Sequence, residues 1–286
     1  MNSFDGRLVV LGATGFVGGN VVTRALALGW DVLGLSSKDI DLRSQDSSAT
    51  LSKLLRDGDT IVHGAAVVPA RNAVDVIQNL LITQHVVDGI AGHEITQLVV
   101  ISSDIVYGSQ SGVYNEVTPC SPDTIHGIMN LARELTCEDV STSIFTVVRP
   151  SAIYGVGDPH NSYGPNRFIS QMIENGEIKI FGEGAAIRDH VLIDDVVEVI
   201  VRAISARQAG VINIASGESI SFAAIAELIR KEGPDGSSIV VTGSESSPTF
   251  RSYDISNLVR LFPDFKPTPP AVGVRRVVTE AARRLS

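Results

Sequence analysis

The segment DTIHGIMNLARE, residues 123–134, contains His126 and, four residues later, Asn130. Together they offer an imidazole for proton transfer and an amide for hydrogen bonding. An imidazole titrates near pH ~6.5, so His126 can exchange a proton without help from a neighbouring charge. Asn130 can form hydrogen bonds but cannot carry a charge. Ser103 and Asp104 follow the apolar run QLVVIS, and they add a hydroxyl and a carboxylic acid that can polarise or protonate a substrate oxygen. These four residues are the candidate catalytic group.

A second group of residues has the spacing of a phosphate-binding turn. Gly12, Gly15 and Gly18 form GxxGxxG between a short apolar run at 8–11 and an apolar helical pattern that ends near Gly29. In such a turn the backbone can approach a pyrophosphate, and the N–H groups of the following helix receive its charge. Strand, turn and helix occur in the required order, so the turn predicts dinucleotide binding. The expected contacts in the turn also include Thr14, Phe16 and Val17.

Both groups need strands whose ends meet at one edge of a sheet. Apolar runs at 31–35, 60–66, 97–103 and 143–150 alternate with helical segments at 51–57, 75–91 and 123–139. Continuous β-branched strands between helices are typical of a parallel sheet that is covered on both faces. The expected fold class is therefore α/β, a doubly wound parallel Rossmann sheet with a smaller α/β substrate domain.

The chain changes character after Pro150, because residues 154–168 are rich in Gly, Pro and Asn and lack a regular pattern. We expect residues 1–152 and 188–215 to form the dinucleotide-binding domain. Residues 153–187 and 216–286 are expected to form the substrate-binding domain. The active site should lie at the carboxyl ends of the strands, in the cleft between the domains.

Composition excludes several classes of function. Thirty-two acidic residues against 23 basic ones give a net charge of -9, which offers no general attraction to nucleic acid or to anionic membranes. Cys120 and Cys137 are the only cysteines, without a CxxC or Cys/His cluster, so neither a disulfide framework nor a metal site is expected. No signal-peptide core and no apolar run near ~20 residues is present. We therefore expect a cytoplasmic protein.

The order of the motifs resembles the extended short-chain dehydrogenase/reductase superfamily, the NAD-dependent epimerases and dehydratases of nucleotide sugars. The segments that carry the resemblance are GATGFVG, VHGAA, ISSDIVYG, VVRPSAIYG, IRDHVLIDD and FRSYDIS, and together they span nearly the whole chain. The resemblance implies further cofactor contacts from Asp41, Leu42, Ala65, Ala66, Asn79, Ser102 and Pro150. It also implies a homodimer through the helix of Asn79 and the helix of His126, in which Ile125, Met129 and Ala132 are apolar positions that fit an interface or the core.

The choice between the two dinucleotides depends on the end of the second strand. An acidic residue there binds the ribose 2′-OH of NAD, whereas a cation or small hydroxyls admit the 2′-phosphate of NADP. This chain has Ser36, Ser37 and Lys38 at that place, which slightly favours NADP(H). Asp39 keeps NAD(H) open.

The substrate that the resemblance implies is a nucleotide diphosphate sugar. Arg188 and Arg251 occupy the motif positions at which the family places arginines toward the diphosphate, and a planar guanidinium binds phosphate oxygens in bidentate fashion. Asn166 and Arg167 are further candidates for holding the nucleotide or the sugar.

The catalytic helix departs from the family pattern. The family has a Tyr and a Lys where this chain has His126 and Asn130, while Gly127 and the segment LARE keep the register of the motif. One hypothesis is a keto reductase or epimerase in which His126 and Ser103 handle protons. A dehydratase is less favoured, because Asp104 supplies the acid of that reaction but Ile105 replaces its base. The alternative is a pseudoenzyme that binds dinucleotide and nucleotide sugar without turnover.

Overall fold

The computed structural model describes residues 4–140, 142–159, 161, 164–244 and 249–285, and the chain forms two compact units. Unit 1 comprises Met1–Gly108, Glu116–Pro150 and Val196–Ile212. Unit 2 comprises Ser109–Asn115, Ser151–Asp195 and Asn213–Ser286. Residues 160 and 162–163 of the Gly/Pro/Asn-rich stretch lie outside the described part.

A six-stranded sheet organises unit 1, with the strand order β11-β6-β4-β3-β1-β2. The pairs β1–β2, β1–β3, β3–β4 and β4–β6 are parallel. The expected doubly wound Rossmann sheet is thereby confirmed. The strands are β1 (Arg7–Leu11), β2 (Asp31–Leu35), β3 (Thr60–His63), β4 (Gln97–Ile101), β6 (Ile144–Pro150) and β11 (Gly210–Ile214).

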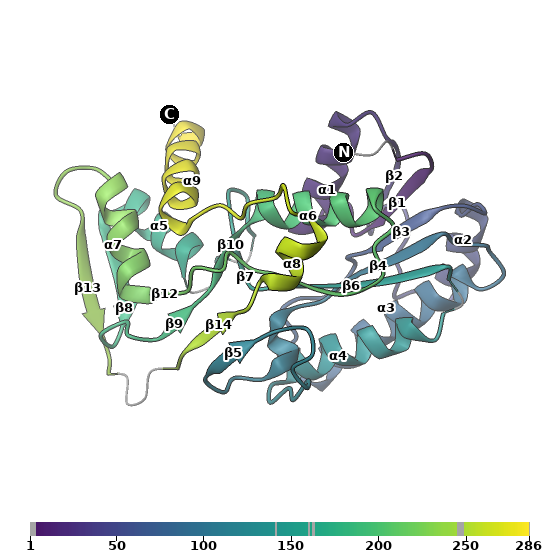
Figure 1. The fold of residues 1–286 in the computed structure, drawn as a ribbon, viewed down its shortest axis with the longest axis horizontal. Helices are drawn as coiled ribbons and strands as arrows, with labels where there is room; N and C mark the ends of the chain where they lie inside the picture. Colours follow the sequence, from purple (N-terminus) through teal and green to yellow (C-terminus); the bar gives the residue numbers. More distant parts are fainter. Residues whose placement is uncertain (1–3, 141, 160, 162–163, 245–248, 286) are drawn as a thin grey trace. The chain divides into compact units, whose positions relative to one another are not determined.

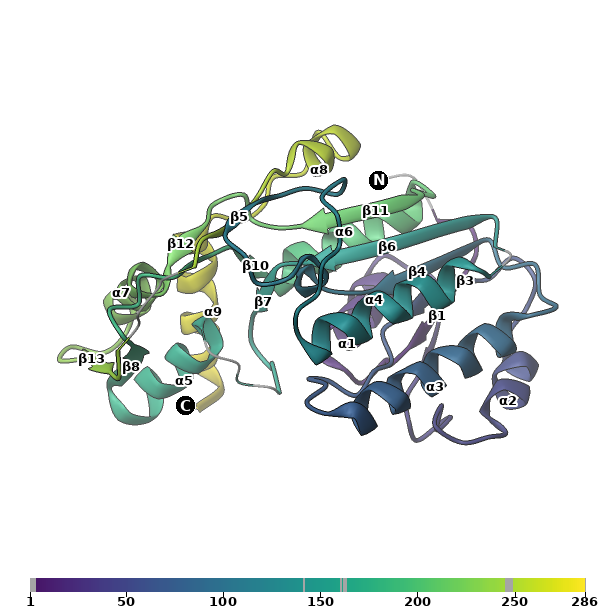
Figure 2. The ribbon, with the colours of Figure 1, turned by 90° about the horizontal axis from the view of Figure 1, so that it is seen from below.

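Helices cover both faces of this sheet, α1 and α6 on one face and α3 and α4 on the other (Figure 1; Figure 2). The helices that accompany the sheet are α1 (Phe16–Ala27), α2 (Ser47–Leu54), α3 (Ala73–Ile90), the 3-10 turn η1 (Asp104–Tyr107), α4 (Ile125–Glu138) and α6 (Ile193–Ser205). Leu11, Ile61, Leu98 and Val100 are fully buried in the core on the sheet. Burying each such side chain stabilises the fold by roughly 1.5–3 kcal/mol.

Unit 2 is built from short strand pairs and helices. Its pairs are β7 (Ala152–Tyr154) with β10 (His190–Leu192), β8 (Glu177–Phe181) with β13 (Ser238–Thr242), β9 (Ile187–Arg188) with β12 (Ile220–Ser221), and β5 (Gly112–Tyr114) with β14 (Arg251–Tyr253). Its helices are α5 (Pro165–Asn175), α7 (Phe222–Glu232), α8 (Ser256–Leu261) and α9 (Pro270–Leu285). Phe168, Met172, Ile225 and Val274 form its core.

Residues 151–152 and 213–215 lie in unit 2, just outside the bounds expected from the sequence, and two longer segments also differ. Residues 109–115 belong to unit 2 because β5 pairs with β14. Residues 188–195 also belong to unit 2, because β10 pairs with β7 and β9 pairs with β12. Both differences arise from strand pairs that join segments far apart in the sequence. Among the described residues, no helix is long and apolar enough to cross a membrane.

Candidate active site

The turn between β1 and α1 depends on glycine. Gly12 has φ +87°, and a Cβ built there would lie 2.9 Å from the backbone N of Ala65. A Cβ on Gly18 would collide with the carbonyl O of Gly12. α1 begins with Gly15 as its N-cap, and within this described stretch no side chain caps the helix and no acidic residue lies in its first turn. The N–H groups of the helix N-terminus are therefore available to an anion.

The end of β2 presents a carboxylate. Asp39 accepts hydrogen bonds from the backbone N (2.8 Å) and the hydroxyl (2.7 Å) of Ser36. The bond from the Ser36 hydroxyl lowers the pKa of Asp39, so this side chain is charged at neutral pH. Ser37 and Lys38 are exposed, whereas Ser36 is buried. Residues 36–39 form one polar turn, in which the Asp39 carboxylate is bonded to Ser36 next to the end of β2.

Two further cofactor candidates follow β2. Asp41 is exposed and forms an ion pair of 2.8 Å with Arg43, whose hydrogen bond lowers the pKa of Asp41. Leu42 is buried, and its carbonyl contacts Nδ1 of His85 at 2.8 Å. The His85 contact ties this loop to α3.

Asn79 fixes the backbone that follows β3. Its Oδ1 accepts from the N of Val67 (2.8 Å), and its Nδ2 donates to the carbonyl oxygens of Val67 (2.9 Å) and Asp75 (2.8 Å). The side chain is fully buried. Asn79 therefore holds in place the chain that carries Ala65 and Ala66, the residues expected to face the cofactor.

Ser103 and Asp104 lie just beyond β4, at the start of η1. The Ser103 hydroxyl donates to Oδ1 of Asp104 (3.1 Å) and accepts from the N of Ile105 (3.3 Å). η1 packs against α4: a Cβ on Gly127 would lie 2.8 Å from the carbonyl O of Ile105. The glycine after His126 thus permits the close approach of the two segments that carry the candidate catalytic residues.

His126 occupies the first turn of α4, which starts where the Thr124 hydroxyl accepts from the N of Gly127 (3.0 Å). The backbone N of Ala70 donates to Nδ1 of His126 (3.3 Å), and Nδ2 of Asn130 contacts Nε2 (3.4 Å). A neutral imidazole can accept a hydrogen bond from only one of these two donors, and an imidazolium can accept a hydrogen bond from neither. Each of these two donors fits a ring nitrogen that carries no proton.

Arg133 lies one turn beyond Asn130 on the same helix, and its side chain is 2% exposed. The guanidinium donates to the carbonyl O of Ile101 (3.1 Å), to Oδ1 of Asn130 (3.3 Å) and to the carbonyl O of Ala65 (3.4 Å). Its contacts reach the chain that follows β3 and the end of β4. Sequence reasoning did not single out this residue.

A buried ion pair anchors the other side of α4. Glu134 accepts from Arg149 at 2.6 and 3.0 Å and from the hydroxyl of Ser102. Arg149 also donates to the Tyr107 hydroxyl (3.0 Å) and lies over the Tyr107 ring, 5.1 Å from its centre. The Glu134 hydrogen bond and charge raise the pKa of Arg149 despite its burial. Ser102, expected near the cofactor, is thus held by its bond to Glu134, and Pro150, also expected there, follows Arg149 as the last residue of β6.

The two candidate diphosphate-binding arginines lie on neighbouring segments of unit 2. Ile187 donates from its N to the carbonyl O of Thr249 (2.8 Å), so the segments that carry Arg188 and Arg251 run together. Arg188 donates to the hydroxyl of Thr249 at 2.6 Å. Arg251 is 4% exposed, donates to the Tyr253 hydroxyl (3.1 Å) and lies over the ring of Tyr114.

Asp189 holds this part of unit 2 together. Its carboxylate accepts four hydrogen bonds of 2.8 to 2.9 Å, from the Ser151 hydroxyl, the N and hydroxyl of Ser216, and the N of Gly217. Burial nevertheless raises the pKa of Asp189. Asn166 accepts from the N of Gly155 (2.9 Å) and donates to Asp158 (2.6 Å), whereas Arg167 is exposed.

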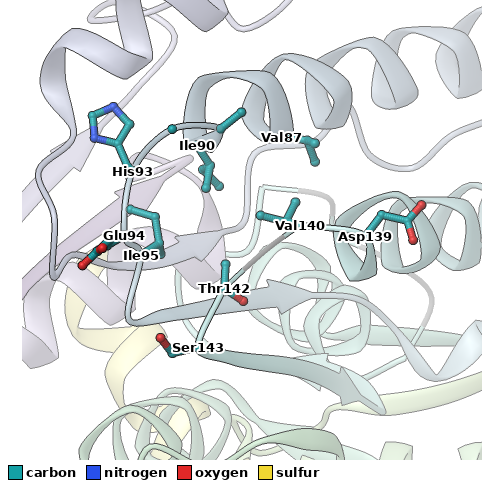
Figure 3. A pocket seen from close by; sticks show the side chains of 11 residues that line it. Val87, Ile90, His93, Glu94, Ile95, Asp139, Val140, Thr142 and Ser143 are labelled. Atoms are coloured by element: carbon teal, nitrogen blue, oxygen red, sulfur yellow. The ribbon is translucent and has the colours of Figure 1, made fainter.

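A pocket in unit 1 lies away from these residues. It is lined by the end of α3 and the end of α4, together with the segments that precede β4 and β6, and includes Val87, His93, Asp139 and Thr142 (Figure 3). It therefore lies at the amino ends of the strands, whereas Gly12, Ala65 and Ser103 follow carboxyl ends. No group of three or more potential metal-binding side chains occurs in the described part of the chain.

Residues 8–215 match the model of the NAD dependent epimerase/dehydratase family. The chain belongs to this family. Within this NAD dependent epimerase/dehydratase family member, two features support dinucleotide binding. They are the glycine turn at Gly12 and the six-stranded parallel sheet.

Known proteins of similar sequence and structure carry related names. A UDP-glucose 4-epimerase of Mycolicibacterium smegmatis is 30% identical over 232 residues, which are 69% of this chain and 72% of that protein. MoeE5, solved with UDP-glucuronic acid and NAD, has a TM-score of 0.85 at 22% identity and covers 98% of this chain and 100% of its own. The UDP-glucuronic acid 4-epimerase of Bacillus cereus, solved with UDP-glucuronic acid and NAD, has a TM-score of 0.82 at 24% identity, with the same coverage. At these identities the two solved structures establish the fold.

Met129 is one of the apolar positions of α4 that fit either an interface or the core. Met129 is fully buried in unit 1, so it belongs to the core and not to a dimer surface. Ile125 on the same helix is 42% exposed. The spacing of α4 explains the difference, because Met129 falls near Asn130 and Arg133 on the face that packs against the rest of unit 1.

Proposed function

We propose that this protein is an NAD(H)-dependent enzyme that changes the oxidation state of a sugar carbon in a nucleotide diphosphate sugar, as an epimerase or a keto reductase. The observation that carries the proposal is the surroundings of His126, where two donors face the imidazole. These donors favour the neutral ring. A neutral imidazole near pH 7 is a suitable base for a sugar hydroxyl.

The glycine turn fits a dinucleotide. Gly12 leaves no room for a side chain beside Ala65, and the first turn of α1 presents backbone N–H groups to a pyrophosphate. Thr14 lies in the glycine turn, and Phe16 and Val17 lie in the first turn of α1. A bound nicotinamide dinucleotide would supply the hydride chemistry. Asn79 then keeps the Ala65–Ala66 backbone in position through its three bonds to the main chain.

We propose NAD(H) as the cofactor because of Asp39. The sequence alone slightly favours NADP(H), because Ser36, Ser37 and Lys38 follow the second strand. The Asp39 carboxylate is charged and is fixed at the end of β2 by Ser36. A fixed carboxylate can bind the ribose 2′-OH, and it repels a 2′-phosphate. We expect NAD to bind at least about tenfold tighter than NADP. Comparable affinities in a fluorescence titration would contradict this choice.

His126 handles the proton in the proposed reaction. The neutral imidazole takes up the proton of the sugar hydroxyl as the carbon is oxidised, and the imidazolium returns a proton to the carbonyl oxygen as the carbon is reduced. Ser103, oriented by Asp104, would donate a hydrogen bond to the same sugar oxygen.

Arg188 and Arg251 are proposed to bind the diphosphate. Both lie on adjoining segments of unit 2. A planar guanidinium binds phosphate oxygens in bidentate fashion. Asn166 and Arg167, at the start of α5, are proposed to contact the nucleotide or the sugar.

The decisive experiment is an assay of the purified protein with a panel of UDP-, dTDP- and GDP-sugars, each with NAD or NADH. Products are identified by mass spectrometry and NMR, and cofactor reduction is followed at 340 nm. We expect inversion at one sugar carbon or reduction of a keto sugar. Tight binding of dinucleotide and nucleotide sugar without any product would contradict the enzymatic proposal and favour the pseudoenzyme.

We also propose a homodimer through α3 and α4. Val74, Ile77 and Leu81 form an exposed apolar stripe on α3, and Ile128 and Leu135 are exposed on α4. Exposed apolar surface of this kind typically marks an interface. We expect light scattering to give twice the chain mass, and Leu81→Glu to shift the protein to monomer. A monomeric wild type would contradict the proposal.

A further inference from the structure

Arg133 is a buried cation without a matching anion. Its partners in the described structure are the carbonyl oxygens of Ile101 and Ala65 and the amide oxygen of Asn130. Its Nε is buried and makes no hydrogen bond to a described atom. Glu134, the next residue, is engaged with Arg149 and Ser102. An arginine remains charged in proteins, so a positive charge lies beneath the site, and the neighbouring Glu134 carboxylate is bonded to other groups.

Such a residue destabilises the fold. A buried charge without a partner costs free energy, and an apolar side chain of similar volume often packs at that position without loss of stability. Two other arginines of unit 1, the half-buried Arg7 and the buried Arg149, illustrate the usual arrangement. Arg7 pairs with Asp59 at 2.7 Å, and Arg149 pairs with Glu134 at 2.6 Å. Arg133 differs from both because its contacts lead to the candidate catalytic residues.

We propose that Arg133 is a positioning residue that supplies the fixed positive charge of the active site and acts through Asn130 on the imidazole of His126. The contacts form a continuous line, from the guanidinium to Oδ1 of Asn130 (3.3 Å) and from Nδ2 of Asn130 to Nε2 of His126 (3.4 Å). The line runs along one face of α4, because residues 126, 130 and 133 follow the helical repeat.

The charge has two consequences for the site. It fixes the Asn130 amide with its oxygen toward Arg133, which directs the NH₂ group toward His126, where Nδ2 also donates to the His126 carbonyl O (3.0 Å). It also opposes a second positive charge on the imidazole nearby. Arg133 therefore keeps His126 neutral, and it does so from a position seven residues further along the helix.

Other ionisable groups lie on the elements that pack around His126. Asp75 and Arg71 lie at the start of α3, Asp104 lies in η1, and Asp123 precedes α4. His63 on β3 is buried, and burial together with the Arg133 charge lowers its pKa well below its usual value. Arg71 and Asp123 are exposed and Asp75 is half-buried, so solvent screens their effect on the imidazole more than it screens that of the buried Arg133.

The test is an NMR titration of the His126 Cε1–H signal, assigned by its loss in His126→Asn. The inference rests on the proposed role of His126, but the titration uses protein without substrate, so its outcome does not depend on turnover. We expect Arg133→Met to raise the titration midpoint of His126 by about one pH unit. The double variant Asn130→Lys/Arg133→Met, which returns a cation to the helix face, should move the midpoint back toward that of wild type.

Controls separate the charge from the packing. Arg133→Lys keeps the charge and should leave the midpoint within ~0.3 pH unit of wild type. Arg71→Met removes an exposed cation at the start of α3 and should also leave the midpoint in place. If Arg133→Met does not fold, Arg133→Gln provides a second neutral side chain. A midpoint that is unchanged or lowered in the folded neutral variant would overturn the inference.

Discussion

The buried pair of Glu134 and Arg149 allows a prediction whose size follows from the structure. Glu134→Gln keeps the shape of the side chain but removes its charge, which leaves the Arg149 guanidinium buried without an anion. The two side chains are 6% and 7% exposed and are joined at 2.6 Å. Breaking a buried pair by removing one partner costs about 3–5 kcal/mol. For a chain of this size that loss lowers the melting temperature by roughly 6–20 °C.

A matched control exists at the surface. Glu227 and Arg230 form the same two-pronged contact at 2.7 Å, but their side chains are 40% and 38% exposed. Glu227→Gln should leave the melting temperature almost unchanged, because water screens and replaces the contact. Scanning calorimetry of wild type, the two single variants and Glu134→Met/Arg149→Met gives the comparison. The double variant should lose less stability than Glu134→Gln, since it leaves no unpaired charge. Equal losses for Glu134→Gln and Glu227→Gln would refute the reasoning.

Two further changes test other parts of the structure. Gly18→Ala should abolish detectable NAD binding in a titration, because its Cβ collides with the Gly12 carbonyl; unchanged affinity would remove the turn from the cofactor site. Burial lowers the pKa of His190 to about 3. Below pH ~6.5 the imidazole is therefore protonated in the unfolded chain but stays neutral in the folded chain. The free energy of unfolding should fall as the pH drops from 6.5 toward 3. His190→Phe, which keeps the edge contact with Phe222, should flatten this fall in urea unfolding at pH 7, 5 and 4, and parallel curves would contradict it.

Much of unit 1 could be predicted from the sequence. β1, α1 and β2 follow from apolar runs and a glycine turn that are local in the chain, and α3 and α4 are long enough for their periodicity to be read. The short strands of unit 2 carry no such pattern. β5 and β14 have three residues each and pair across more than one hundred residues of chain, so no local signal marks them.

The candidate site shows the same division. Gly12, Ser103 and His126 could be named as candidates from the sequence because each lies in a motif with its own chemistry. Arg133 was missed because an arginine on a helix is usually an exposed charge. Its spacing gave a signal, since residues 126, 130, 133 and 137 repeat with the period of a helix face, and the last three are buried. The role of Asp39 depended on its contact with Ser36, which only the folded turn reveals.

The central claim is that His126 carries the proton in a reaction on a nucleotide diphosphate sugar. The most direct measurement is the turnover rate of His126→Ala beside wild type, with the sugar that the panel identifies and with saturating NAD. Loss of a general acid–base group predicts a fall of about 10²–10⁴-fold in turnover, with NAD affinity unchanged. Turnover by His126→Ala at the wild-type rate would contradict the account.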